Sequence, residues 1–354
     1  MAKKQEVICC AVDEYGIIYI KGKDAMAYFV NLKDETWTIP KLAEAADRAE
    51  VFERFYFSLQ RPEILKDFDE HLFKKRPDIR LFLLPEKVNG HRDVIPYSKE
   101  SLDAISNMQN LLHLTLRFKQ AQDLGALSSS NLKSLGLDFL EKSRQPMSLA
   151  FVKNFPGLAE LSLQNTPFAG LETIKELKNL RKLYIGNVTL DDLSFLEGAG
   201  LDHLILDTCR LDCDLSSICK AKLQKFETLS NHNLTNLDFI SGLTSLRYLK
   251  ISQAKAAFLP DFSSLTSLDE LHLSGMKSLE SISGIASAQS LKTLQLQELS
   301  AKIKAEDLRI LLPLQNLDNL YIDYLDFGKA RIKAVTGMFH EAGKGHILKN
   351  GMLV

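Results

Sequence analysis

Three cysteines and two histidines lie close together in the sequence and carry the residue types of a metal site. They are Cys209, Cys213, Cys219, His203 and His232. Thiolate and imidazole groups at short spacing suit Zn²⁺, so this segment raises the hypothesis of a metal centre. We favour the interpretation that the cysteines are small apolar side chains within a packed core, and we expect no metal and no cofactor.

A second set of titratable residues, Asp67, Asp69, Glu70 and His71, lies on a predicted helix beside the basic residues 74–76. Alternating acidic and basic side chains are typical of a solvated helix face, which we favour over an acid–base catalytic site. The sequence lacks Gly-x-x-x-x-Gly-Lys-Ser/Thr, Gly-x-Gly-x-x-Gly, His-Glu-x-x-His and Gly-x-Ser-x-Gly. We therefore expect no catalytic residues and no enzymatic activity.

The elements that position these side chains are indicated by a leucine repeat. Leucine accounts for 61 of the 354 residues, and 51 of these lie in residues 101–330, against 8 in residues 1–100. The pattern Leu-x-x-Leu-x-Leu, with conservative apolar replacements, recurs ten times at a mean spacing near 23 residues. The copies begin at Leu111, Leu132, Leu158, Leu180, Leu201, Leu223, Leu246, Leu268, Leu291 and Leu317.

Each copy of the repeat has two halves with different periods. The alternation of Leu183 and Ile185 suits a short strand, whereas Leu171, Ile174 and Leu177, three residues apart, suit a helical or 3₁₀ return. One such coil cannot bury its own leucines, so successive coils must stack until they form a continuous core.

This pattern resembles the leucine-rich repeat superfamily over residues 100–328, and it is most similar to the 22-residue class of internalin-like and phosphatase-regulator-like proteins. The resemblance implies an α/β fold, a right-handed solenoid in a horseshoe or arc, with a parallel concave β-sheet. The family usually places Asn or Cys at the ninth repeat position to bond neighbouring turns, and here only Cys209 and Asn231 match. We expect the other turns to bond through backbone and water. Those ninth positions hold Thr166, Val188, Ala254, Met276, Leu299 and Leu325.

The chain divides by composition into three predicted parts. Residues 1–76 form an α+β region, a small β meander in residues 1–40 followed by helices in residues 41–76 that could cap the first coil; residues 77–327 form the solenoid, and residues 328–354 form a C-terminal capping helix and tail. In the first part we expect strands and then helices. The expected strands are Val7–Val12 paired with Ile17–Lys21 and Ala27–Leu32 paired with Thr36–Ile39; the expected helices are Lys41–Leu59 and Pro62–Lys75; Ile79–Leu83 is expected to be a degenerate repeat strand.

Charge and apolar patterning restrict the partner and the compartment. Lys and Arg total 44 against 45 for Asp and Glu, a net charge of −1, which provides no global field for nucleic acid or an anionic membrane. No apolar run has the length of a signal peptide or a membrane span. Five cysteines without a repeating spacing do not resemble a disulfide framework, so we expect a cytoplasmic protein, monomeric because the C-terminal helix covers one end.

Strand alternation sends the leucines inward and the intervening side chains onto a concave sheet. Tyr, Arg and exposed aliphatic side chains on adjacent strands are typical of protein interfaces. We therefore predict a non-enzymatic module that binds another protein, as a recognition, inhibitory or regulatory subunit, possibilities that include a toxin-immunity protein. The alternatives are a bacterial effector or enzyme with its activity in the N-terminal region, and a self-associating scaffold. The candidate binding residues are Lys182, Tyr184, His203, Ile205, Lys225, Arg247, Tyr248, Lys250 and His272.

Overall fold

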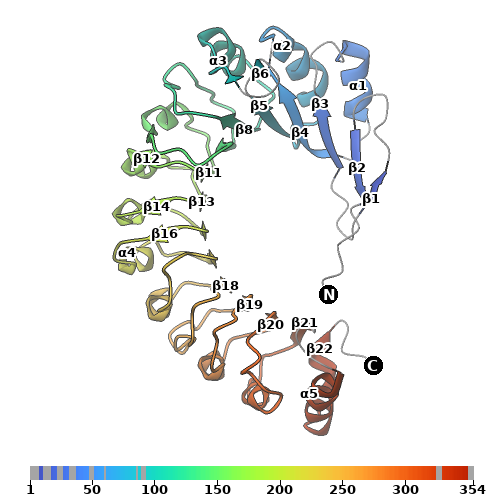
Figure 1. The fold of residues 1–354 in the computed structure, drawn as a ribbon, viewed down its shortest axis with the longest axis vertical. Coiled ribbons are helices and arrows are strands. Elements are labelled where there is room, and N and C mark those ends of the chain that lie inside the picture. The colour runs from blue at the N-terminus through green and yellow to red at the C-terminus, as the bar shows by residue number, and fades with distance from the viewer. Residues whose placement is uncertain are drawn as a thin grey trace. The chain divides into compact units, whose positions relative to one another are not determined.

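A computed structural model describes residues 8–10, 17–21, 27–31, 37–47, 52–59, 61–84, 87–88, 93–323 and 329–349. The chain forms two compact units, residues 1–180 and 181–354. Each unit is an α/β leucine-rich-repeat solenoid in which parallel strands alternate with helical or 3₁₀ return segments (Figure 1).

The sheet of the first unit begins antiparallel and continues parallel. β1 pairs with β2 as the first predicted hairpin requires, and β2 pairs with β3. From β3 onward the neighbours run parallel, in the order β3-β4-β5-β8-β9-β11. The strands are β1 (Ile8–Cys10), β2 (Ile17–Lys21), β3 (Ala27–Asn31), β4 (Phe52–Ser58), β5 (Arg80–Leu84), β8 (His113–Phe118), β9 (Ser134–Phe139) and β11 (Glu160–Gln164), with the short pairs β6 (Lys87–Val88) and β7 (Asp93–Val94), and β10 (Met147–Ser148) and β12 (Phe168–Ala169).

Helices cover one face of the first unit's sheet (Figure 1). An aromatic cluster fills the space beneath them: the ring of Phe68 lies 5.2 Å from that of Phe55 and 4.8 Å from that of Phe57, and Trp37 lies 5.0 Å from Phe55. Such tilted and edge-on pairs add to the stabilisation from burying the rings. The return segments are α1 (Ile39–Asp47), α2 (Ile64–Phe68) with the π-helical turn η2 (Asp69–Phe73), α3 (Lys99–Ser106), η3 (Ala150–Asn154) and η4 (Leu171–Glu176).

The predicted helix Lys41–Leu59 is wrong beyond Asp47, because residues 52–58 form strand β4. In the parallel register with β5, Phe55 is opposite Leu81 and Phe57 is opposite Leu83. The extended conformation therefore buries both rings in the leucine layer, and this tertiary gain outweighs local helix propensity.

Three other predictions for the N-terminal region have mixed outcomes. The strand predicted at Thr36–Ile39 is wrong where the structure describes it, because Ile39 begins α1 and Pro40 fits the first helical turn; Thr36 lies outside the described residues. The helix predicted at Pro62–Lys75 is confirmed as α2 and η2, and the degenerate repeat strand as β5. The predicted turns at residues 13–16 and 33–35 also lie outside the described residues.

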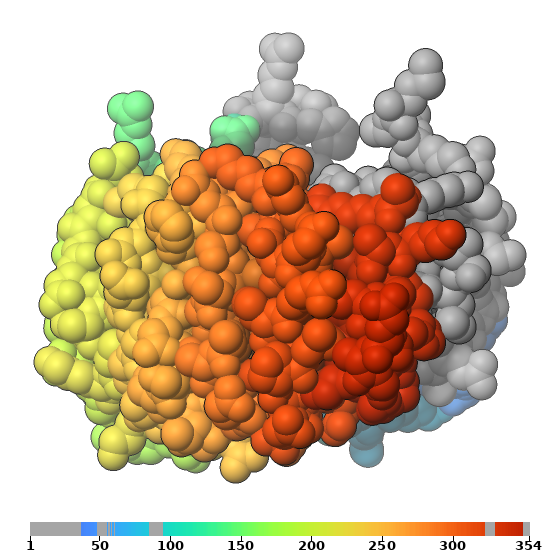
Figure 2. Space-filling model, turned by 90° about the horizontal axis from the view of Figure 1, so that it is seen from below, coloured from blue at the N-terminus to red at the C-terminus, as the bar shows by residue number. Residues whose placement is uncertain are grey.

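The second unit repeats one strand–return coil along its length. Its strands pair in parallel between equivalent repeat positions, in the order β13-β15-β17-β18-β19-β20-β21-β22. Figure 2 shows the successive coils as side-by-side bands of colour from yellow to red. The strands are β13 (Lys182–Gly186), β15 (His203–Asp207), β17 (Lys225–Leu229), β18 (Tyr248–Ser252), β19 (Glu270–Ser274), β20 (Thr293–Gln297), β21 (Asn319–Asp323) and β22 (Leu348–Lys349), with the outer pair β14 (Thr189–Leu190) and β16 (Arg210–Leu211). The returns are η5 (Ser194–Leu196), α4 (Ser216–Cys219), η6 (Asp238–Gly242), η7 (Ser283–Ser287) and η8 (Glu306–Leu311), followed by α5 (Lys329–Glu341) and η10 (Gly345–Ile347).

The core of the second unit consists of the strand leucines and their replacements. Leu183, Leu204, Phe226, Leu249 and Leu271 are fully buried, and they occupy the same position on successive strands. Full burial of one such side chain contributes about 1.5–3 kcal/mol. The predicted C-terminal helix is confirmed as α5, which buries its own apolar side chains. No helix among the described residues is both long enough and apolar enough to cross a membrane.

The turns after the strands bond more through side chains than the repeat pattern suggests. Thr166, at a ninth repeat position, donates its hydroxyl hydrogen to the Gln145 carbonyl oxygen at 2.9 Å. At the ninth position of another repeat Ala254 is exposed, and the preceding residue, Gln253, is buried instead and donates to Thr228 Oγ1 at 2.9 Å. The backbone bonding that we expected is also present: the amide of Arg210 donates to the carbonyl of the preceding coil at 2.9 Å. At these positions, residues other than Asn or Cys therefore form the polar bonds between neighbouring turns.

Candidate functional site

Two columns of side chains run across the strands of the second unit, as strand alternation predicts. One column places Lys182 beside His203, His203 beside Lys225, and Lys225 beside Tyr248. These side chains belong to the first residue of each strand. Along β13, β15 and β18, half-buried side chains that face outward alternate with fully buried side chains that face inward. The predicted residues of this column therefore share one face of one sheet, whereas Arg247 precedes β18 and belongs to neither column.

The second column contains a residue that sequence reasoning left out of the candidate site. Tyr184 lies beside Ile205, and Lys250 lies beside His272, but Glu227 occupies the place between Ile205 and Lys250. Its carboxylate accepts a hydrogen bond from His203 Nε2 at 3.0 Å and lies 4.0 Å from Lys250 Nζ. The signal was present in the sequence, because position 227 has the same place in the repeat as Tyr184 and Lys250.

Charge around Glu227 holds it in the ionised form. The hydrogen bond from His203 lowers the pKa of the Glu227 carboxyl, and the positive charges of Lys250 and Lys182 lower it further, against the opposing effect of burial. Glu227 therefore forms one short hydrogen bond, with His203, and one longer ion pair, with Lys250, at the centre of the two columns.

Glu227→Gln is expected to lower the free energy of unfolding at pH 7 by about 1–2 kcal/mol, because a charge-assisted hydrogen bond becomes a neutral one. Since the native pKa is depressed, the carboxylate stabilises the fold above its ordinary pKa of 4.5, and this stabilisation is lost as pH falls through the native value. Urea unfolding between pH 3 and pH 7 measures the effect. A difference between wild type and variant that stays constant down to pH 3 would contradict this assignment.

Aromatic side chains flank the charged centre. The rings of Tyr248 and His272 lie 5.1 Å apart and are tilted by 58°. Burial, with the negative charges of Glu227 and Glu270, raises the pKa of Tyr248 to about 12, so its hydroxyl is protonated at neutral pH. Tyr184 donates its hydroxyl hydrogen to Asp207 at 2.8 Å.

The remaining basic candidates are the most exposed. Lys225 is exposed at the start of β17, and Arg247 precedes β18 with its side chain 65% exposed. Arg247 Nη1 lies 3.8 Å from Asp269, which also pairs with Lys292 at 2.8 Å. A pair this exposed contributes little to stability.

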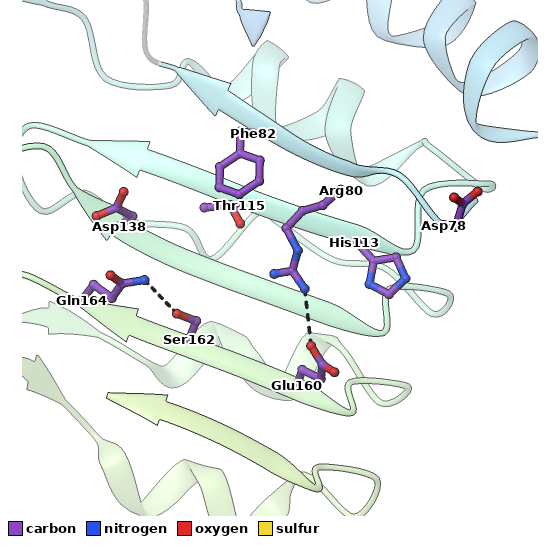
Figure 3. A pocket seen from close by; sticks show the side chains of 9 residues that line it. All are labelled: Asp78, Arg80, Phe82, His113, Thr115, Asp138, Glu160, Ser162 and Gln164. Atoms are coloured by element: carbon purple, nitrogen blue, oxygen red, sulfur yellow. Dashed lines mark hydrogen bonds and ion pairs between the residues drawn. The ribbon is translucent and has the colours of Figure 1, made fainter. Parts of the chain in front are cut away.

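A hollow of about 670 Å³ lies on the sheet of the first unit, and sequence reasoning did not single it out (Figure 3). Arg80 Nη2 lies 3.3 Å from Glu160 Oε2, and Ser134 donates to the same oxygen at 3.3 Å. Burial, and to a lesser extent the nearby charge of Arg80, lowers the pKa of His113, whose Nδ1 is buried. The available signal was the pair of small residues, Ser134 and Gly136, on one strand between long polar side chains.

The cysteine cluster is dispersed in the structure. Cys209 is fully buried, and burial raises the pKa of its thiol to about 11. Cys219 ends α4, and Cys213 lies half-buried among aspartates that help to raise its pKa. Among the described residues, no three His, Cys, Asp or Glu side chains are grouped as a metal would require.

The interpretation of Asp69 as part of a solvated helix face is wrong. Its side chain is only 7% exposed and accepts hydrogen bonds from the backbone amides of Gln109 and Asn110 at 2.9 and 2.8 Å. Its neighbour Glu70 is exposed, as expected. The sequence pattern did not distinguish them because the contact joins segments 40 residues apart.

Comparison with known proteins adds little to these features. No protein-family model matches the chain, and no curated protein matches it. One similar solved structure is the crystal structure of an internalin C2 from Listeria monocytogenes, with 21% sequence identity and a TM-score of 0.32 over 67% of this chain and 88% of the other. The fold assignment therefore comes from the parallel strands and repeated returns of this chain.

Proposed function

We propose that this chain is a non-enzymatic module that binds a protein partner on the concave face of its second unit. The binding surface comprises the nine predicted residues and Glu227. One observation carries the proposal: tyrosine, aliphatic and basic residues lie side by side on neighbouring strands, and their side chains are partly exposed. These residue types contribute most of the binding energy in protein interfaces.

The size and charge of this face support a specific partner. With strands about 4.8 Å apart, the eight-strand ladder of the second unit spans about 34 Å, which accommodates a standard interface of about 800 Å² per partner. The basic residues of this surface are Lys182, Lys225, Arg247 and Lys250, and the acidic residues on it or in contact with it are Asp207, Glu227, Asp269 and Glu270. Because the charges are mixed, we expect the partner to present both signs of charge around an apolar or aromatic centre.

The finer assignments belong to the same proposal. The 3₁₀ returns support the 22-residue repeat class. The role that we propose for the module is an inhibitory or regulatory subunit, which includes a toxin-immunity protein. The free thiols of Cys209, Cys213 and Cys219 support a reducing cytoplasmic compartment. Three further statements stay predictions: the domain boundaries at residues 76 and 327, the monomeric state, and the absence of nucleic-acid and membrane partners.

Arg247→Glu combined with Tyr248→Ala is expected to weaken partner binding at least about tenfold, because each removes a side chain of a type that dominates interfaces. Arg247 is exposed, but Tyr248 packs on His272, so the melting temperature of the variant is measured beside its binding to establish that it is folded. The measurement is affinity capture from the native cell by the full chain, mass spectrometry of the captured protein, and titration of the purified partner.

A control makes comparable changes at two exposed residues outside the proposed surface. Arg309→Glu lies in η8, and Phe258→Ala removes a ring that is 61% exposed. This control should bind as wild type does. If the partner binds the Arg247/Tyr248 variant with unchanged affinity, the proposed surface is wrong, and the alternative with activity in the N-terminal region gains support.

A further inference from the structure

One carboxylate on the concave face of the second unit has only neutral hydrogen-bond partners. Asp207 is the last residue of β15, and its Oδ2 accepts the hydroxyl hydrogen of Tyr184 at 2.8 Å while its Oδ1 accepts that of Thr208 at 2.8 Å. These two donors orient the carboxylate without cancelling its charge. Among the residues that the structure describes, no Lys, Arg or His side chain forms an ion pair with Asp207.

The other acidic residues on or beside the proposed surface each contact a basic side chain. The pairs are Glu227 with His203 and Lys250, Glu270 with His272, and Asp269 with Arg247 and Lys292. A partner that bound one of these carboxylates would have to compete with a contact inside this chain. Asp207 offers its charge without that competition.

The side chains around Asp207 on the sheet are uncharged. Its neighbours in register are Gly186 on β13 and Leu229 on β17, and Ile205 lies two residues earlier on the same face of β15. Leu229 and Ile205 are half-buried, so a partner that covers them also removes water from the carboxylate. A carboxylate covered without a cation is strongly unfavourable, and therefore the partner must supply a cation.

Gly186 allows Tyr184 to hold the carboxylate in place. A Cβ at Gly186 would lie 2.7 Å from Cε1 of Tyr184 and 2.8 Å from its hydroxyl oxygen, so a larger residue would push the phenol away from Asp207. The carboxylate therefore has a fixed position before a partner binds, which lowers the cost of ordering it on binding. Each of its oxygens accepts one hydroxyl hydrogen and retains a second lone pair.

Two remaining lone pairs on one oriented carboxylate fit the two parallel N–H groups of a guanidinium, whereas an ammonium is a point charge without this fork. Arginine is also enriched in protein interfaces, whereas lysine is depleted. We propose that Asp207 binds an arginine side chain of the partner protein. This assignment rests on the proposed function and adds one acidic residue to the proposed surface.

The purified partner is the probe for this assignment. Asp207→Asn in the full chain should weaken its binding at least about tenfold, because a charge-assisted hydrogen bond to a covered carboxylate becomes a neutral one. Asp238→Asn makes the same change at an exposed residue of η6, on the return side of the coil, and should bind as wild type does. Circular dichroism and the melting temperature establish that both variants are folded.

Chemical protection identifies the group that meets Asp207. Limited modification with phenylglyoxal, which reacts with guanidinium groups, is followed by mass spectrometry of the partner in each saturated complex. One arginine of the partner should be protected by the wild-type chain and modified faster in the complex with Asp207→Asn. Its replacement by Gln should weaken binding as Asp207→Asn does, and the two changes together should cost less than the sum of their separate effects.

The variant at Arg247 and Tyr248 separates this inference from the proposed function. If that variant binds the partner with unchanged affinity, the proposed surface is wrong and the assignment of Asp207 is overturned with it. If that variant binds weakly while folded Asp207→Asn binds as wild type does, only the arginine site is overturned. Weak binding by Asp207→Asn without a protected arginine also overturns the assignment.

Discussion

Asp69→Ala is expected to lower the free energy of unfolding by about 3 kcal/mol or more. The carboxylate accepts the backbone hydrogens of Gln109 and Asn110 and also the side-chain amide of Asn110 at 3.0 Å. Alanine removes three hydrogen bonds to a charged acceptor, and a hydrogen bond to a charged group contributes about 1.5–3 kcal/mol. Urea unfolding followed by circular dichroism at pH 7 measures the loss.

Two neighbouring variants establish the cause. Glu70→Ala changes an exposed carboxylate on the same helical turn, whose contact with Lys66 is 4.0 Å long, and should change stability by no more than about 0.5 kcal/mol. Asp69→Asn keeps one acceptor oxygen but places an NH₂ group against backbone donors. Its loss of stability should therefore lie between the losses of Asp69→Ala and Glu70→Ala. If Asp69→Ala and Glu70→Ala lose equal stability, the buried hydrogen bonds contribute nothing.

Asn231→Ala should cost a similar amount, about 3 kcal/mol, because its side chain bonds two coils of the second unit. Its Oδ1 accepts from the Cys209 amide at 2.8 Å, and its Nδ2 donates to the Leu206 carbonyl at 3.0 Å and to Thr228 Oγ1 at 2.9 Å. Gln253 donates to the same Thr228 oxygen at 2.9 Å, which extends the network to a third coil. The residue is only 4% exposed, so water cannot replace these bonds.

The same turn contains a matched control for Asn231. Asn233 also bonds the neighbouring coil, through the Leu211 amide and carbonyl, but it is exposed, so water replaces the lost bonds in Asn233→Ala. That variant should lose less than about 1 kcal/mol. A double-mutant cycle with Gln253→Ala should give a coupling of at least about 0.5 kcal/mol, since the two amides share Thr228. Equal losses at positions 231 and 233 would contradict the buried network.

The repeat register was predictable because alternation along a strand is local. Once Leu183 and Ile185 face inward, Lys182 and Tyr184 must face outward, and similar repeat lengths bring equivalent positions side by side. The strand β4 was not predictable in the same way. Phe55 and Phe57 carry the inward pattern, but the surrounding residues also suit a helix, and only pairing with β5 decides between them.

The sequence by itself determined the stacked coils, the inward leucines and the columns of outward side chains, because these depend on periods of two, three and about 23 residues along the chain. Only the tertiary structure decided the partners of Asp69, the central place of Glu227 and the hollow between Arg80 and Glu160. Those features join residues from different coils, and their energies depend on distance, burial and neighbouring charge, which periodicity does not encode.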